Sequence, residues 1–126
     1  MKMILIIALA AGSFAANAYG PRVAIEQSWE ILQANVVKAA KVLGFMPTEG
    51  ADSELKQALF YLTTRVLNSQ NVMIGVYGLA AARQKVQANP AGEVKAEEAE
   101  RFALSCMAII AEPSLQLVKT VKPGQG

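Results

Sequence analysis

The stretch RVAIEQSWEILQANVVKAAKVL, residues 22–43, decides the fold. Its apolar residues recur every three or four positions, which places them along one side of a helix. They are Ile25, Trp29, Leu32, Val36, Ala40 and Leu43. Gly44 and then Pro47 follow, and both are typical of a helix end. The pattern predicts a long amphipathic helix that buries one face in a core.

A second helix is predicted from about residue 54. Asp52 or Ser53 can accept hydrogen bonds from the N–H groups of its first turn. Its apolar face is formed by Leu55, Leu59, Leu62 and Val66 and widened by Phe60 and Leu67. We expect this helix to weaken near residues 68–71. None of those residues forbids a helix, so residues 54–88 form either one long helix or two.

A third helical segment covers about residues 72–88 and ends at the sequence NPAG, residues 89–92. A fourth begins near Glu93 and ends before Pro113, because proline disfavours helical geometry in the residue before it. Its interior face is expected to hold Val94, Phe102, Cys106, Ile109 and Ile110. Residues 114–122 fit either a strand or a short helix. We predict an all-α fold, a small up-and-down bundle of about four helices with a possible short fifth element at residues 114–122.

The N-terminus predicts an exported bacterial protein. Lys2 precedes an apolar run at residues 3–11, and a small-x-small cleavage sequence ends at Ala18. The run is shorter than the roughly 20 residues that a membrane-spanning helix needs, so we expect no stable span in the mature chain. The mature protein would be periplasmic or extracellular. We therefore expect a cleaved secretory signal peptide at residues 1–18, a single helical domain at 19–122 and a disordered tail at 123–126.

The composition argues against most catalytic chemistry. The chain has no histidine and one cysteine, which removes Ser-His-Asp and Cys-His pairs and the usual zinc sites. No glycine-rich phosphate loop is present, so we predict neither a metal nor a cofactor. The balance of 12 basic and 10 acidic residues does not favour nucleic-acid binding. The enzymatic alternative is a carboxylate-dependent hydrolase, with Glu30 and Glu97 as the residues to test.

The segment 66–82 carries no charge and has three interpretations. It could be a central core helix, a self-association face or a membrane-inserted segment. Gly75, Gly78 and Ala82 have three- and four-residue spacing and form the candidate self-association face. Cys106 lies in an apolar stretch and is expected to be a buried, inert thiol.

By elimination, the sequence predicts a non-enzymatic protein that acts by protein–protein interaction or self-assembly. The alternative is a periplasmic carrier of a small apolar ligand held between helices. The candidate lining of such a pocket is Leu59, Met73, Phe102 and Met107.

Overall fold

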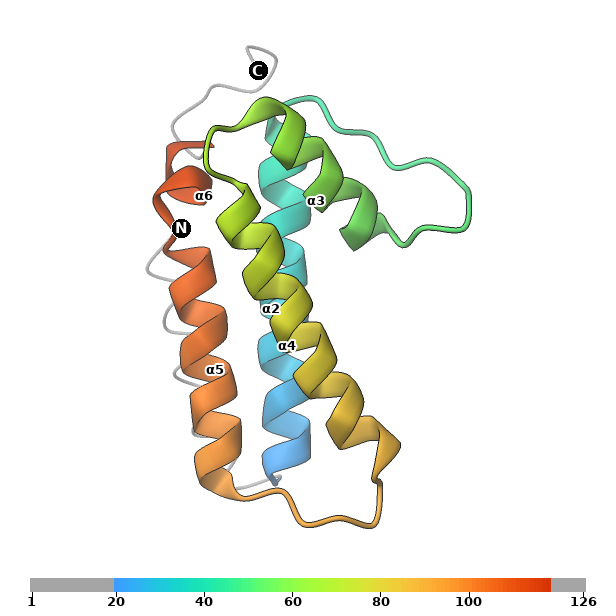
Figure 1. The fold of residues 1–126 in the computed structure, drawn as a ribbon, viewed down its shortest axis with the longest axis vertical. Coiled ribbons are helices and arrows are strands. Elements are labelled where there is room, and N and C mark those ends of the chain that lie inside the picture. Colours follow the sequence, from blue (N-terminus) through green and yellow to red (C-terminus); the bar gives the residue numbers. More distant parts are fainter. Residues whose placement is uncertain (1–19, 119–126) are drawn as a thin grey trace.

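The structure is a computed structural model and describes residues 20–118. Its helices are α2 (Pro21–Val42), α3 (Glu54–Arg65), α4 (Gln70–Ala88), α5 (Ala96–Ile110) and α6 (Pro113–Val118) (Figure 1). No strand occurs in this part of the chain, and the predicted all-α bundle is confirmed. The predicted signal peptide at residues 1–18 and the predicted tail at 123–126 lie outside the described residues.

The central element is α2, which packs against α3, α4, α5 and α6. It is the long amphipathic helix predicted from residues 22–43, and Leu32 and Val36 on its apolar stripe are fully buried. In Figure 1, α4 runs antiparallel to α2 and α5, whereas the short α3 crosses α2 obliquely near its C-terminal end. Each of the other described helices therefore contacts α2, and α4 also packs against α3 and α5.

The end of α2 fixes the start of the next connection. Gly44 has a φ of +104°, a left-handed conformation that glycine adopts without a Cβ penalty. The N–H of Phe45 donates to the carbonyl of Ala40, and that of Gly44 to the carbonyl of Lys41, both at 3.0 Å. This pair of bonds is a Schellman motif, and it turns the chain toward α3.

The open question about residues 54–88 is answered by two helices, α3 and α4. Asn68 takes a left-handed φ of 65°, which breaks the helical path. The buried hydroxyl of Ser69 lies within hydrogen-bond distance of the carbonyls of Leu62 (2.9 Å) and Val66 (2.8 Å). Both carbonyls also accept from a backbone N–H, so the single hydroxyl proton adds a bond that ties Ser69 to the end of α3. At the other end of α3, Ser53 accepts a hydrogen bond from the N–H of Lys56 at 3.2 Å, which identifies Ser53 as the cap.

Two boundaries differ from the sequence expectation. α5 begins at Ala96 and not near Glu93, because a turn holds residues 89–92 and an extended segment follows it. Val94 therefore lies before the first residue of α5 and is half-buried. The fifth element is a short helix, α6, over residues 113–118, and its Leu115 packs into the core.

One end of the bundle is held by two arginines. The guanidinium of Arg22 on α2 donates to the carbonyls of Val86 (2.8 Å), Asn89 (2.7 Å) and Gly92 (2.5 Å), at and just beyond the end of α4. Arg83 on α4 makes a two-pronged ion pair with Glu26 on α2, in which Nε and Nη2 each come within 2.8 Å of a carboxylate oxygen. These contacts fix the C-terminal half of α4 against α2.

We expect Arg22→Met to lower the free energy of unfolding by about 1–2 kcal/mol, because it keeps the apolar stem but removes the guanidinium that donates to three carbonyls at and beyond the end of α4. Urea unfolding of the predicted mature chain, residues 19–126, measures this. Lys38→Met, on an exposed part of α2, is the matched control and should change stability by less than about 0.5 kcal/mol. Equal stabilities of the two variants would contradict the role of Arg22.

Candidate functional site

An apolar cavity lies where the connection after α2 meets α3 and α4. Its volume is about 390 Å³. Its apolar lining is Phe45, Met46, Phe60, Tyr61, Met73 and Tyr77, and its polar rim is Asp52, Lys56, Gln57 and Thr64. Four of the six aromatic residues between positions 20 and 118 line it. Aromatic and methionine side chains are typical of surfaces that bind other molecules.

The floor of the cavity is rigidly positioned. Phe45 is buried directly after the turn that ends α2, and its ring lies 5.4 Å from that of Tyr61 in a tilted arrangement. The Tyr61 hydroxyl donates to the carbonyl of Leu43 at 3.0 Å, which ties α3 to the end of α2. The guanidinium of Arg65 covers the Tyr61 ring at 4.5 Å from its centroid.

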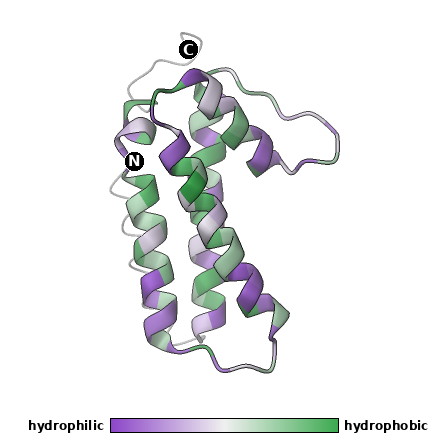
Figure 2. Ribbon diagram, viewed as in Figure 1, coloured by the Kyte–Doolittle hydropathy of each residue, from purple (hydrophilic) through white to green (hydrophobic). Residues whose placement is uncertain are grey.

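Five large apolar side chains on the connection after α2, on α3, on the turn after α3 and on α4 are exposed. The exposed fractions are 80% for Met46, 69% for Phe60, 85% for Leu67, 66% for Ile74 and 45% for Tyr77. We call these five residues the α3–α4 apolar surface. Figure 2 shows how hydropathy changes along α4, whose N-terminal half is mostly hydrophobic and whose C-terminal half is more hydrophilic.

The prediction that Phe60 and Leu67 widen the buried face of the second helix is wrong. α3 buries Leu55, Ala58, Leu59 and Leu62 against its neighbours. Phe60 lies about 100° around the helix from Leu59 and faces solvent. Leu67 lies in the turn beyond the end of α3, so it does not belong to a helical face.

The core-helix interpretation of residues 66–82 is also corrected. The central helix is α2, and α4 buries only Val72 and Val76 among its side chains. The opposite side of α4 exposes Ile74, Tyr77 and Ala81. A helix that is apolar all round thus lies at the surface of the bundle.

The three candidate self-association residues have different surroundings. A Cβ on Gly75 would lie 2.8 Å from Cδ1 of Ile109, so this glycine is a point of close approach between α4 and α5. A Cβ on Gly78 would have no neighbouring atom within 4 Å, and both Gly78 and Ala82 are exposed. Two of the three residues are therefore on the surface, and their role in self-association stays a prediction.

The four candidate pocket residues are not brought together around either cavity described here. Leu59 and Phe102 are buried in the core, and Met73 and Met107 are half-buried beside it. Only Met73 lines the cavity between α3 and α4. A second, more open cavity of about 600 Å³ runs along α2 and is lined by none of the four. Its lining is Gln33, Ala34, Val37, Lys38, Lys41, Val42 and Glu54.

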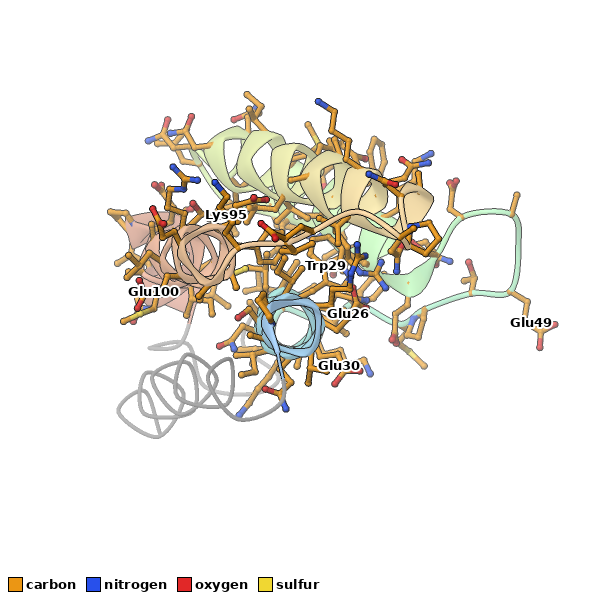
Figure 3. All side chains as sticks on the ribbon, turned by 90° about the horizontal axis from the view of Figure 1, so that it is seen from below. Glu26, Trp29, Glu30, Glu49, Lys95 and Glu100 are labelled. Carbon is orange, nitrogen blue, oxygen red and sulfur yellow. The ribbon has the colours of Figure 1, made fainter. Side chains whose placement is uncertain are left out.

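The two acidic residues named as catalytic candidates come from different helices. Glu30 and Glu97 lie exposed on α2 and α5, and Glu26 is occupied by Arg83. Figure 3 shows Glu30, Glu49 and Glu100 on separate elements and directed outward. Within residues 20–118 no group of three or more acidic or cysteine side chains is placed to hold a metal ion.

Comparison of the chain with protein-family models, curated proteins and solved structures finds no significant match. None of the helices between residues 20 and 118 combines the length and the apolar character needed to cross a bilayer.

The close approach at Gly75 predicts opposite effects for one substitution at two neighbouring sites. Gly75→Leu should lower the free energy of unfolding by about 1–3 kcal/mol, because the new side chain overlaps Ile109. Gly78→Leu should leave it unchanged or raise it by less than about 1 kcal/mol, because leucine favours the helix and its Cβ would have no neighbouring atom within 4 Å. Urea unfolding compares them, and a stable Gly75→Leu variant would contradict the packing.

The burial of Cys106 should affect both the pH dependence of stability and the reactivity of its thiol. Desolvation raises the pKa of its thiol from 9.0 to about 12. The folded protein keeps this proton at a pH where the unfolded chain releases it, so the stability relative to Cys106→Ala should fall as pH rises from 9.0 to about 12. An aromatic disulfide reagent should label Cys106 in urea and not in buffer. Equal labelling rates in the two conditions would contradict the burial.

Proposed function

We propose that this chain is an exported, non-enzymatic helical protein that acts by protein–protein contact through the α3–α4 apolar surface. The observation that carries the proposal is the exposure of Met46, Phe60 and Tyr77 around one aromatic cavity, with Leu67 and Ile74 also exposed on the turn after α3 and on α4. Clustered exposed apolar side chains with a polar rim are the usual anatomy of an interaction site.

The energetics favour a partner at this surface. Transfer of a large apolar side chain from water to a packed environment is worth about 1.5–3 kcal/mol. Phe45 and Tyr61 are held by their ring contact and by the hydrogen bond from Tyr61 to Leu43. A partner would therefore meet a pocket that is already formed, and binding would require little ordering of these side chains. Exposed aromatic anchors next to a pocket are the residues that most often dominate binding energy.

A small apolar ligand is the alternative occupant. The cavity volume of about 390 Å³ falls in the range of ligand sites. Leu67 and Ile74, however, are exposed and do not line this cavity, so a ligand seated in it would leave them in water. A protein partner covers the cavity and these two side chains together.

Export and the absence of enzymatic activity are proposed from the sequence. Lys2, the apolar run and the cleavage sequence ending at Ala18 support secretion. The lack of histidine and the solvent-exposed positions of Glu30 and Glu97 support a binding function over catalysis.

A photocrosslinking amino acid at position 60, introduced in cells that export the protein, tests the proposal. We expect an adduct with the mass of a second protein on a chain that begins at Tyr19. The same amino acid at Leu104, which is 63% exposed on α5, is the matched control and should give little adduct. Adducts of equal yield at both positions, or none at position 60, would contradict the proposal. A mass gain of small-molecule size would favour the ligand carrier.

A further inference from the structure

The charges around the α3–α4 apolar surface have one sign at both ends. Arg65, at the end of α3, is exposed and lies over Tyr61 of the cavity floor. Lys85 is exposed on the side of α4 that also carries Ile74, because residues eleven apart are about three helical turns apart on one face. Neither cation has an ion-pair partner among the described residues.

The nearby carboxylates do not balance these cations. Asp52 lines the cavity but is paired with Lys56 at 3.2 Å. Glu54 is paired with Lys41 of α2 at 3.4 Å. Glu49 belongs to the connection before α3 and points away from the bundle (Figure 3). The surface is thus apolar in the middle and basic at each end.

This distribution disfavours a second copy of the chain as the occupant. In a two-fold contact each copy presents the same surface to the other. Arg65 of one copy would then approach Lys85 or Arg65 of the other, whichever way the helices run. Like charges brought together at an interface oppose association.

Resting on the proposed function, we propose that the α3–α4 apolar surface binds a helical segment of another protein whose apolar face is flanked by carboxylates. The flanking carboxylates would meet Arg65 and Lys85, and the apolar side chains would enter the cavity beside Phe60 and Tyr77. No strand edge exists among residues 20–118 to pair with an extended peptide, so recognition depends on side chains, as when a helix lies in a groove. The low profile of α4 at Ala81 lets such a helix approach closely.

Two synthetic amphipathic peptides of about 18 residues test this proposal. Both peptides are labelled with fluorescein and share the same apolar face. One peptide carries glutamates at both ends, and the other carries lysines there. Fluorescence anisotropy with residues 19–126 at low salt should give an affinity about fivefold higher for the glutamate peptide. The difference should shrink at high salt.

Charge variants locate the effect. Arg65→Gln and Lys85→Gln should each reduce the preference for the glutamate peptide by about half, and Phe60→Ala should weaken binding of both peptides. Arg101→Gln, an exposed cation on α5, is the matched control and should change neither affinity. Because Lys85 makes no ion pair or hydrogen bond within residues 20–118, its variant tests charge without a risk to folding.

The outcomes separate this inference from the proposed function. Equal binding of the two peptides, or binding of neither, would overturn the acidic helix as occupant, while a protein adduct at position 60 would still support protein contact. A dimer in sedimentation that Phe60→Ala dissociates would overturn it in favour of a second copy. Preference for the glutamate peptide that survives both charge substitutions would overturn the assignment to Arg65 and Lys85.

Discussion

Burial of one apolar stripe of α2 is the constraint on which the rest of the structure depends. Each of the other described helices contacts α2, and its fully buried Leu32 and Val36 lie in the middle of the core. A single long helix can offer such a surface only when its apolar residues keep a helical period over its whole length. The Schellman turn at Gly44 and the cap at Ser53 then determine where the chain turns back and begins α3.

The outer position of α4 follows from how it is attached. On its inner side, Val72 and Val76 are buried, and Gly75 allows close contact with Ile109 of α5. Nearer its C-terminal end, Arg83 pairs with Glu26 of α2. These contacts use one side of the helix. The other side is left apolar and exposed, and it joins Phe60 and Met46 in one surface. Such a surface is costly to leave in water, which is why we connect it with binding.

The fold was largely predictable because periodicity and capping are local properties. The stripe of residues 22–43, the cap at Ser53 and the stop before Pro113 are all visible in the sequence. The break at Asn68 was not decided, because it depends on the Ser69 hydroxyl reaching carbonyls of α3. The candidate site was mostly missed. Which side of the apolar α4 faces the core is decided by the helices around it and cannot be read from its own residues. Phe60, which lies off the apolar stripe of its helix, was the one local signal of an exposed apolar side chain.

The most direct test of the account compares neighbouring residues with opposite roles. Phe60 is 69% exposed and Leu59 is 1% exposed, although both are large apolar side chains on α3. In urea unfolding, Phe60→Ser should lower the free energy of unfolding by less than about 1 kcal/mol, because the exposed Phe60 side chain contributes little packing to the folded protein. Leu59→Ser should lower the free energy of unfolding by about 2–5 kcal/mol, as expected when a core side chain is truncated. A comparable loss for Phe60→Ser would mean that this surface is part of the core, and would contradict its assignment as a surface free for binding.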